Sequence, residues 1–169
     1  SIAPFLLRLS TRDVEEPSTP VNSTRRNQFW LVSLGGICGS AVVFWVCRSE
    51  THFLGDGYQI LKNLSDNVSS QIVWKYSAEY LQWLIFKLIN GHSLTQARLA
   101  IQIVSIVSGI ATIAVVLWSA RKLGYSLLSS WILVLGLLSS GVSLMFFGYI
   151  ETYPPLIFAL TLVCLAGVL

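Results

Sequence analysis

The run LAIQIVSIVSGIATIAVVLWSA, residues 99–120, decides the fold class of this chain. It contains no charged side chain and is followed directly by Arg121 and Lys122. A helix of about 20 apolar residues crosses a hydrocarbon core about 30 Å thick, so this run predicts a transmembrane helix. The whole chain agrees, since 54% of its residues are hydrophobic and only 11% are charged. A soluble domain has about 25% charged residues. We therefore predict an integral membrane protein of the all-α class.

Outward from this run, three further apolar stretches predict spans at residues 29–47, 127–147 and 154–169. The last begins with Pro154 and Pro155, which suit the first turn of a helix. The predicted fold is a polytopic helical protein with about four spans, in which residues 28–169 form the transmembrane domain. Residues 1–27 mix proline, hydroxyl and charged side chains and predict a disordered or interfacial tail. The final run is still apolar at Leu169, so we expect the last span to be cut short.

The segment 76–89 is apolar but contains Glu79, Gln82 and Lys87. At 1.5 Å per residue it reaches only about 21 Å, which is short of the hydrocarbon core. We predict that it lies in the membrane interface as a helix within one outer loop, residues 48–98. A true span remains the alternative.

This choice decides which compartments the two acidic motifs face. The first is FLGDGY, residues 53–58, and the second is GYIETYPP, residues 148–155. If segment 76–89 lies flat, two spans separate Asp56 from Glu151, and both acids face the same compartment. If it crosses, they face opposite compartments.

Basic residues predict the orientation. The positive-inside rule makes cytoplasmic the side that carries most basic residues in short loops. That side holds Arg8, Arg12, Arg25, Arg26, Arg121 and Lys122. The N-terminus is therefore predicted to be cytoplasmic, with the acidic motifs outside, and we expect a bacterial inner membrane. The net charge of +3 is spread along the chain, which does not favour a nucleic-acid partner. Cys38, Cys47 and Cys164 lie in apolar runs and are predicted to act as small hydrophobic residues.

Small residues one helical turn apart predict close helix packing. Gly35 with Gly39 forms a GxxxG, and Ser105 with Gly109 and Gly136 with Ser140 repeat the spacing. We expect these faces to pack against protein, and the Gly35/Gly39 face to be available for membrane-protein partners. The alternative is that small residues are simply common in membrane helices.

The acidic residues are the candidates for chemistry. Asp56 lies between two glycines, which allow a turn that presents the carboxylate to a ligand; an ordinary turn is the alternative. Glu151 lies among aromatic residues, and an apolar environment raises the pKa of a carboxyl unless a cation or hydrogen bond compensates. The alternative for Glu151 is an interfacial acid that reaches water.

Other polar residues support weaker hypotheses. Glu50 and His52 precede Asp56, but their spacing matches no metal-ligand motif, so we predict neither a metal nor another cofactor. Lys62 and Arg98 are candidates for holding an anionic group, with interfacial anchoring as the alternative.

The motifs resemble those of a known superfamily. The order of a basic tail, one span, a long outer loop with an early Asp and an interfacial helix, then two spans joined by a tight basic turn, resembles the N-terminal part of GT-C superfamily glycosyltransferases. These include protein O-mannosyltransferases and the aminoarabinose transferase of lipid A. Both acidic motifs, and residues 91–98 from Gly91 to Arg98, resemble sequence features of that superfamily. The similarity covers residues 29–169.

The resemblance implies an activity and roles for the site residues. It implies inverting sugar transfer from a polyprenyl-phosphate donor on the outer membrane face, with Asp56 as general base. Glu151 would orient sugar hydroxyls, and Lys62 or Arg98 would stabilise the departing phosphate. We take Tyr58 and Tyr153, the aromatic neighbours of the two acids, as further substrate-binding candidates.

The chain departs from the superfamily in two ways. Residues 78–81 read AEYL where many relatives carry an acidic-Pro pair, and relatives are several times longer. A non-catalytic membrane subunit of a larger complex is therefore the rival hypothesis. A transporter fragment ranks last, because no charge lies inside a predicted span.

Overall fold

The computed structural model describes residues 23–48, 57–66 and 77–169, and the regular elements in these ranges are all helices. This confirms the all-α prediction for the described part of the chain. The helices are α2 (Ser23–Val46), α3 (Gly57–Ser65), α5 (Ser77–Leu88), α6 (Leu94–Lys122), α7 (Leu127–Leu138), α8 (Ser143–Phe146) and α9 (Tyr153–Ala166). Helix α2 thus begins inside the segment predicted as a tail.

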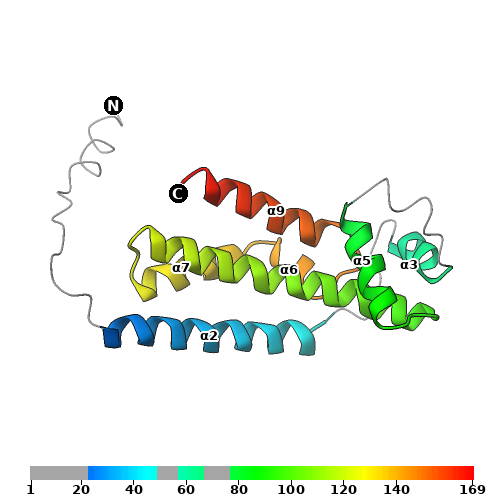
Figure 1. The fold of residues 1–169 in the computed structure, drawn as a ribbon, viewed down its shortest axis with the longest axis horizontal. Helices are drawn as coiled ribbons and strands as arrows, with labels where there is room; N and C mark the ends of the chain where they lie inside the picture. The colour runs from blue at the N-terminus through cyan, green and yellow to red at the C-terminus, as the bar shows by residue number, and fades with distance from the viewer. Residues whose placement is uncertain (1–22, 49–56, 67–76) are drawn as a thin grey trace.

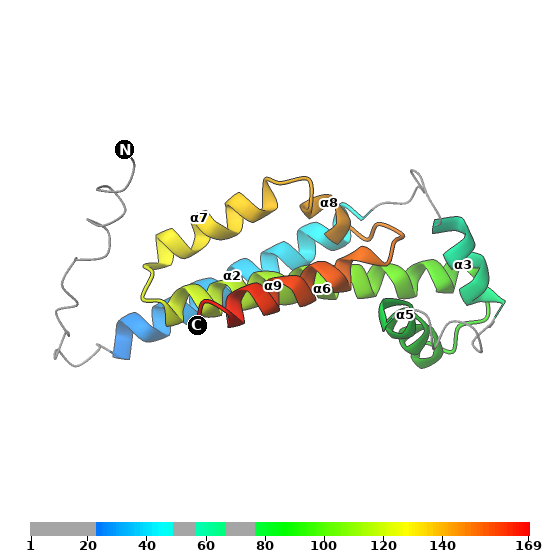
Figure 2. The ribbon, with the colours of Figure 1, turned by 90° about the horizontal axis from the view of Figure 1, so that it is seen from above.

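Helix α6 is the centre of the molecule, and helices α2, α3, α5, α7, α8 and α9 all contact it. Helices α2 and α9 lie on opposite sides of α6 (Figure 1), and α7 lies along a further side (Figure 2). The run that predicts the membrane class therefore also forms the helix on which the others pack.

Helix α6 begins before the predicted span because its N-terminus is capped. The hydroxyl of Ser93 accepts a hydrogen bond from the backbone N–H of Gln96 at 3.3 Å. The side-chain oxygen of Gln96 in turn accepts one from the backbone N–H of His92 at 2.8 Å. Such reciprocal bonds satisfy N–H groups that have no partner within the helix. Arg98, which directly precedes the apolar run, therefore lies inside the helix.

The predicted third span, residues 127–147, is not one helix. Helix α7 has 12 residues and stops at Leu138, and the four-residue α8 follows after a turn. Serine hydroxyls bond to nearby carbonyls at the break: Ser139 to Gly136 and Ser140 to Leu137. Such side-chain bonds compete with the helical pattern. Because 12 helical residues reach about 18 Å, α7 is too short to cross a bilayer alone.

Two of the described helices are long and apolar enough to cross a membrane: α2 over Asn27–Val46, and α6 over its full length. Helix α9 has 14 residues, or about 21 Å, and is shorter than a span. The structure therefore supports two spans among the described residues, where the sequence predicts about four.

The surface of the bundle is apolar. Only 17% of the apolar window of α2 is buried, and Leu31, Leu34, Val42 and Val46 of this helix are all exposed. Helix α9 likewise exposes Val163. Soluble proteins rarely leave contiguous surfaces of this kind in water, whereas lipid covers them.

Cation–aromatic pairs lie near both ends of the bundle. Arg48 lies 4.7 Å from the Trp45 ring at the C-terminal end of α2. At the opposite end of α2, Arg121 from α6 lies 5.1 Å from the Phe29 ring. Basic and aromatic residues gather at the two surfaces of a bilayer, so this arrangement is typical of helices that span one.

One of the three small-residue faces packs as predicted. A Cβ built on Gly109 would lie 2.7 Å from atoms of Phe146, and Ser105 is fully buried. For Gly35, Gly39 and Gly136, no described atom lies within 4 Å of such a Cβ. The packing expected at these glycines is therefore not found among the described residues, and Gly36 instead lies against the ring of Trp131.

Helix α5 corresponds to the segment predicted at 76–89. It runs across the end of the bundle, whereas α2, α6 and α9 run along it (Figures 1 and 2). The side chain of Phe86 packs there with Leu61 of α3 and Ile101 of α6 in a buried cluster. A helix with this direction lies flat on the membrane if α6 crosses it.

Candidate functional site

Gly57 of the first acidic motif meets Ile150 of the second at the end of the bundle. Asp56 lies outside the described residues, but Gly57, which follows it, is buried at the start of α3. A Cβ on Gly57 would lie 2.8 Å from the backbone oxygen of Ile150, and there is no room for one. The neighbour of Asp56 therefore contacts the neighbour of Glu151, although the two motifs are far apart in the sequence.

The 148–152 loop, which joins α8 to α9, presents Glu151. Its N–H groups and carbonyls are outside the helical pattern, and Glu151 closes a tight turn by donating its N–H to the oxygen of Tyr149 at 3.0 Å. Gly148 takes a φ of 70°, a left-handed conformation that favours glycine. Ile150 is buried in the cluster of Leu61, Phe86 and Ile101. The apolar side chain of Ile150 thus anchors the loop, while Glu151 is half-buried.

Two side chains from other helices hold the backbone of this loop. Ser105 of α6 donates its hydroxyl to the Tyr149 oxygen at 3.2 Å. Gln82 of α5 donates its side-chain amide to the Glu151 oxygen at 3.0 Å. The loop therefore bridges the central helix and the crosswise helix.

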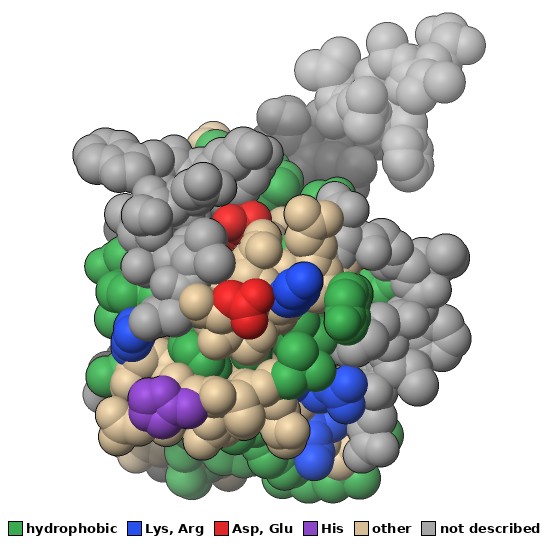
Figure 3. Space-filling model, turned by 90° about the vertical axis from the view of Figure 1, so that its right-hand side faces the viewer, with side chains coloured by type: hydrophobic (Ala, Val, Ile, Leu, Met, Phe, Trp, Pro, Cys, Tyr) green, Lys and Arg blue, Asp and Glu red, His purple; other side chains and the backbone are tan. Residues whose placement is uncertain are grey.

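The other predicted site residues differ in exposure. Tyr58 is 62% exposed and Tyr153 is 51% exposed, so both are accessible to a ligand. Lys62 is exposed on α3, whereas Arg98 is half-buried in the first turns of α6. All four lie on elements that meet at the α3–α5 end. Figure 3 shows acidic and basic side chains side by side on the surface of this end.

Sequence reasoning missed Gln82, which it treats only as a polar interruption of an apolar segment. It is 1% exposed and lines a cavity of about 20 Å³ together with Glu79, Asn63 and two apolar residues. This space is close to that of a single water molecule. The spacing of the sequence could have predicted this burial, because Gln82 lies one helical turn before Phe86 and therefore on the same face of the helix.

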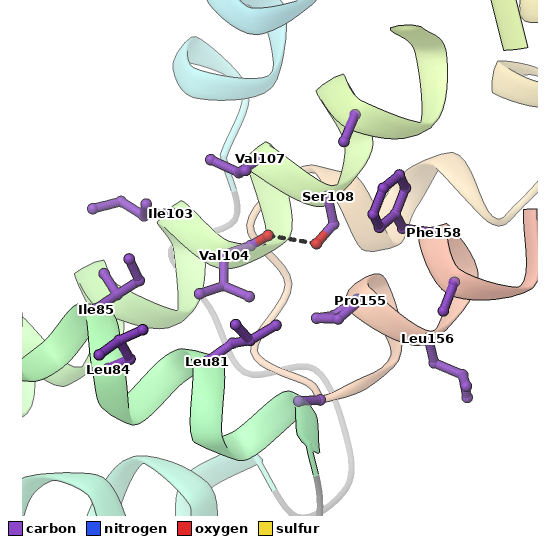
Figure 4. A pocket seen from close by; sticks show the side chains of 13 residues that line it. Leu81, Leu84, Ile85, Ile103, Val104, Val107, Ser108, Pro155, Leu156 and Phe158 are labelled. Atoms are coloured by element: carbon purple, nitrogen blue, oxygen red, sulfur yellow. Dashed lines mark hydrogen bonds between the residues drawn. The ribbon is translucent and has the colours of Figure 1, made fainter. Parts of the chain in front are cut away.

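An apolar groove of about 450 Å³ lies between α5, α6 and α9 (Figure 4). Leu81 and Ile85 of α5, Val104 and Val107 of α6, and Pro155 of α9 are among its lining residues. The lining also includes the Ser108 hydroxyl, which is already bonded to the Val104 oxygen at 2.8 Å. The groove therefore suits a hydrocarbon chain that makes no hydrogen bonds.

Among the described residues, no group of three or more His, Cys, Asp or Glu side chains is placed to hold a metal ion. Glu50 and His52, the residues of the metal alternative, lie outside the described ranges.

Comparison with family models, with curated proteins and with solved structures found no match to this chain.

Proposed function

We propose that this chain is, or forms part of, a GT-C-like membrane glycosyltransferase, which transfers a sugar from a polyprenyl-phosphate donor on the outer membrane face. One observation carries the proposal: Gly57 lies against Ile150, so the segments that bear Asp56 and Glu151 meet at one end of the bundle. In such a site one carboxylate can act as the general base and the other can orient the sugar hydroxyls.

The apolar groove supports a lipid-linked donor. A polyprenyl-phosphate sugar has a long hydrocarbon chain and a polar head, so its site needs an apolar channel next to a polar region. Pro155 lines the groove, and it follows Glu151 by only four positions along the chain. Helix α5 borders both regions, through Leu81 on the groove side and Gln82 on the loop side.

In this proposal Asp56 takes the proton from the acceptor hydroxyl while that oxygen forms a bond to the anomeric carbon. The bond from this carbon to the phosphate oxygen breaks, and the polyprenyl phosphate leaves with the electron pair. Arg98 and Lys62 stabilise its negative charge. Glu151, Tyr58 and Tyr153 contact the sugar or the acceptor.

The proposed setting is a bacterial inner membrane with a cytoplasmic N-terminus and the acidic motifs outside. Helices α2 and α6 are long and apolar enough to cross it. Helices α7 and α9 lie at the positions of the other two predicted spans, but with 12 and 14 residues they are shorter than a span.

A second candidate function is a non-catalytic membrane subunit, and the open face at Gly35 and Gly39 favours it. No described atom lies within 4 Å of a Cβ built on either glycine. GxxxG faces let a second helix approach closely. In this case the protein purifies from native membranes with a stoichiometric partner, and Gly35→Leu releases that partner.

The activity is tested with Asp56→Asn, in membranes containing the protein and supplied with radiolabelled polyprenyl-phosphate sugars. Loss of the general base should slow transfer by about 10²- to 10⁴-fold. Asp66→Asn is the matched control, because Asp66 is an exposed acid just after α3. It should leave transfer unchanged, and both variants should insert into the membrane normally. Equal turnover in the wild type and Asp56→Asn rejects the proposed base.

A further inference from the structure

Gln82 is a buried polar residue on a helix at the edge of the bundle. It is 1% exposed, while Tyr80 and Leu81 beside it are exposed. Burial of an amide without a hydrogen-bond partner costs about 1–3 kcal/mol. Its position on the inner face of α5 is therefore explained by the bond that it makes.

That bond reaches the backbone of a candidate catalytic residue. The Gln82 amide donates to the Glu151 oxygen at 3.0 Å across 69 positions of sequence. The other side chain that holds the loop, Ser105, shares its hydroxyl between the Tyr149 oxygen at 3.2 Å and the Ile101 oxygen at 3.0 Å. A hydroxyl has a single proton to donate, and Ser105 shares it between two acceptors. The contact of Ser105 with the loop is therefore weaker than the contact of Gln82 with the loop.

Helix α5 also borders the apolar groove. Leu81 and Ile85, which lie either side of Gln82 in the sequence, line the groove. The same short helix therefore contacts the groove on one face and the 148–152 loop on another.

We infer that Gln82 is a positioning residue, which fixes the backbone of Glu151 to α5 and so sets the direction of the Glu151 carboxylate. The consequence for sugar transfer rests on the proposed function, whereas the contact itself does not. The experiment therefore measures the conformation of the loop first and activity second.

The loop is probed through Thr152→Cys, in a chain whose exposed Cys38, Cys47 and Cys164 are changed to serine. The labelling rate of this thiol by a small maleimide is divided by the rate at Tyr125→Cys, a site on the turn between α6 and α7. Gln82→Met keeps a side chain of similar length but removes the donor. We expect it to raise the ratio several-fold.

Two comparisons separate positioning from general loosening. Thr112→Val removes a buried hydroxyl whose bond is local, to the Ser108 oxygen at 2.8 Å, and should leave the ratio unchanged. Gln82→Glu donates a hydrogen bond only when its carboxyl is protonated. Over a pH series its ratio should be close to that of Gln82 in acid and close to that of Gln82→Met in alkali.

An unchanged ratio in Gln82→Met overturns the inference, and so does a pH-independent ratio in Gln82→Glu. If transfer is detected, Gln82→Met should lower kcat while the KM for the donor stays the same. A rise in the KM for the donor with kcat unchanged contradicts this role for Gln82. If the wild type transfers no sugar, the proposed function fails, and the labelling result still decides whether Gln82 holds the loop.

Discussion

At the scale of single residues, several close contacts in this bundle depend on glycines, which have no side chain. Gly57 admits the Ile150 backbone, Gly91 admits the Phe86 ring and Gly109 admits Phe146, each closer than a Cβ would allow. The sequence shows these glycines but not their partners. The GxxxG pattern draws attention to Gly35 and Gly39, whereas the α2 glycine that lies against another helix is Gly36, which contacts Trp131. Spacing identifies small residues without saying which face meets another helix.

Gly109 and Gly136 form a matched pair for testing this packing. A Cβ at Gly109 would lie 2.7 Å from Phe146, while no described atom lies within 4 Å of one at Gly136. Gly109→Ala should therefore destabilise the protein by about 1–3 kcal/mol, because overpacking displaces the neighbouring ring. Gly136→Ala should be neutral or stabilising, since alanine favours a helix over glycine by about 1 kcal/mol. Thermal unfolding in detergent micelles measures both, and equal midpoints would contradict the predicted contact.

At the scale of elements, the sequence predicts that a helix exists more accurately than it predicts the residues at which the helix begins and ends. Helix α6 begins at Leu94, several residues before the apolar run, because Ser93 and Gln96 cap it. Helix α7 stops at Leu138, although the sequence remains apolar, because serine hydroxyls near Gly141 bond to local carbonyls. An apolar run indicates which residues favour contact with lipid, whereas capping residues and serine hydroxyl bonds determine where a helix begins and ends.

The cap of α6 gives a prediction at this scale. Ser93→Ala should lower the stability of the protein by about 1 kcal/mol, because the N–H of Gln96 loses its acceptor. Ser93→Asp keeps an acceptor at the N-terminus and should restore stability. Thr95→Ala in the exposed first turn is the control and should change little. Unfolding midpoints of the purified protein decide the outcome, and loss of stability in the aspartate variant as well would show that the cap bond is not the cause.

At the scale of the whole molecule, the central question is which side of the membrane each end of the bundle faces. The basic turn at Arg121 and Lys122 lies at the end of α6 opposite to the α3–α5 end. Both acidic motifs reach the α3–α5 end, as the contact of Gly57 with Ile150 shows. The crosswise direction of α5 agrees with a helix that lies along the membrane surface.

Three exposed tyrosines test this arrangement. Tyr58, Tyr153 and Tyr125 are 62%, 51% and 46% exposed, and each is changed to cysteine in the cysteine-free chain. With a maleimide that cannot cross membranes, Tyr58→Cys and Tyr153→Cys should react from the outside of intact cells. Tyr125→Cys should react only after the membrane is opened. Reaction of positions 58 and 153 from opposite sides would rule out a shared site for the two acids.

The sequence by itself determined the helical class, the two runs long and apolar enough to cross a membrane and the chain positions of both acidic motifs, because apolar length and charge are properties of local runs. Only the tertiary structure decided that Gly57 lies against Ile150, that α7 is too short to span and that no described residue covers the face at Gly35 and Gly39. It alone also made Gln82 a partner of Glu151. These features depend on which helix faces meet, and that choice is made by long-range packing around α6, which no local pattern contains.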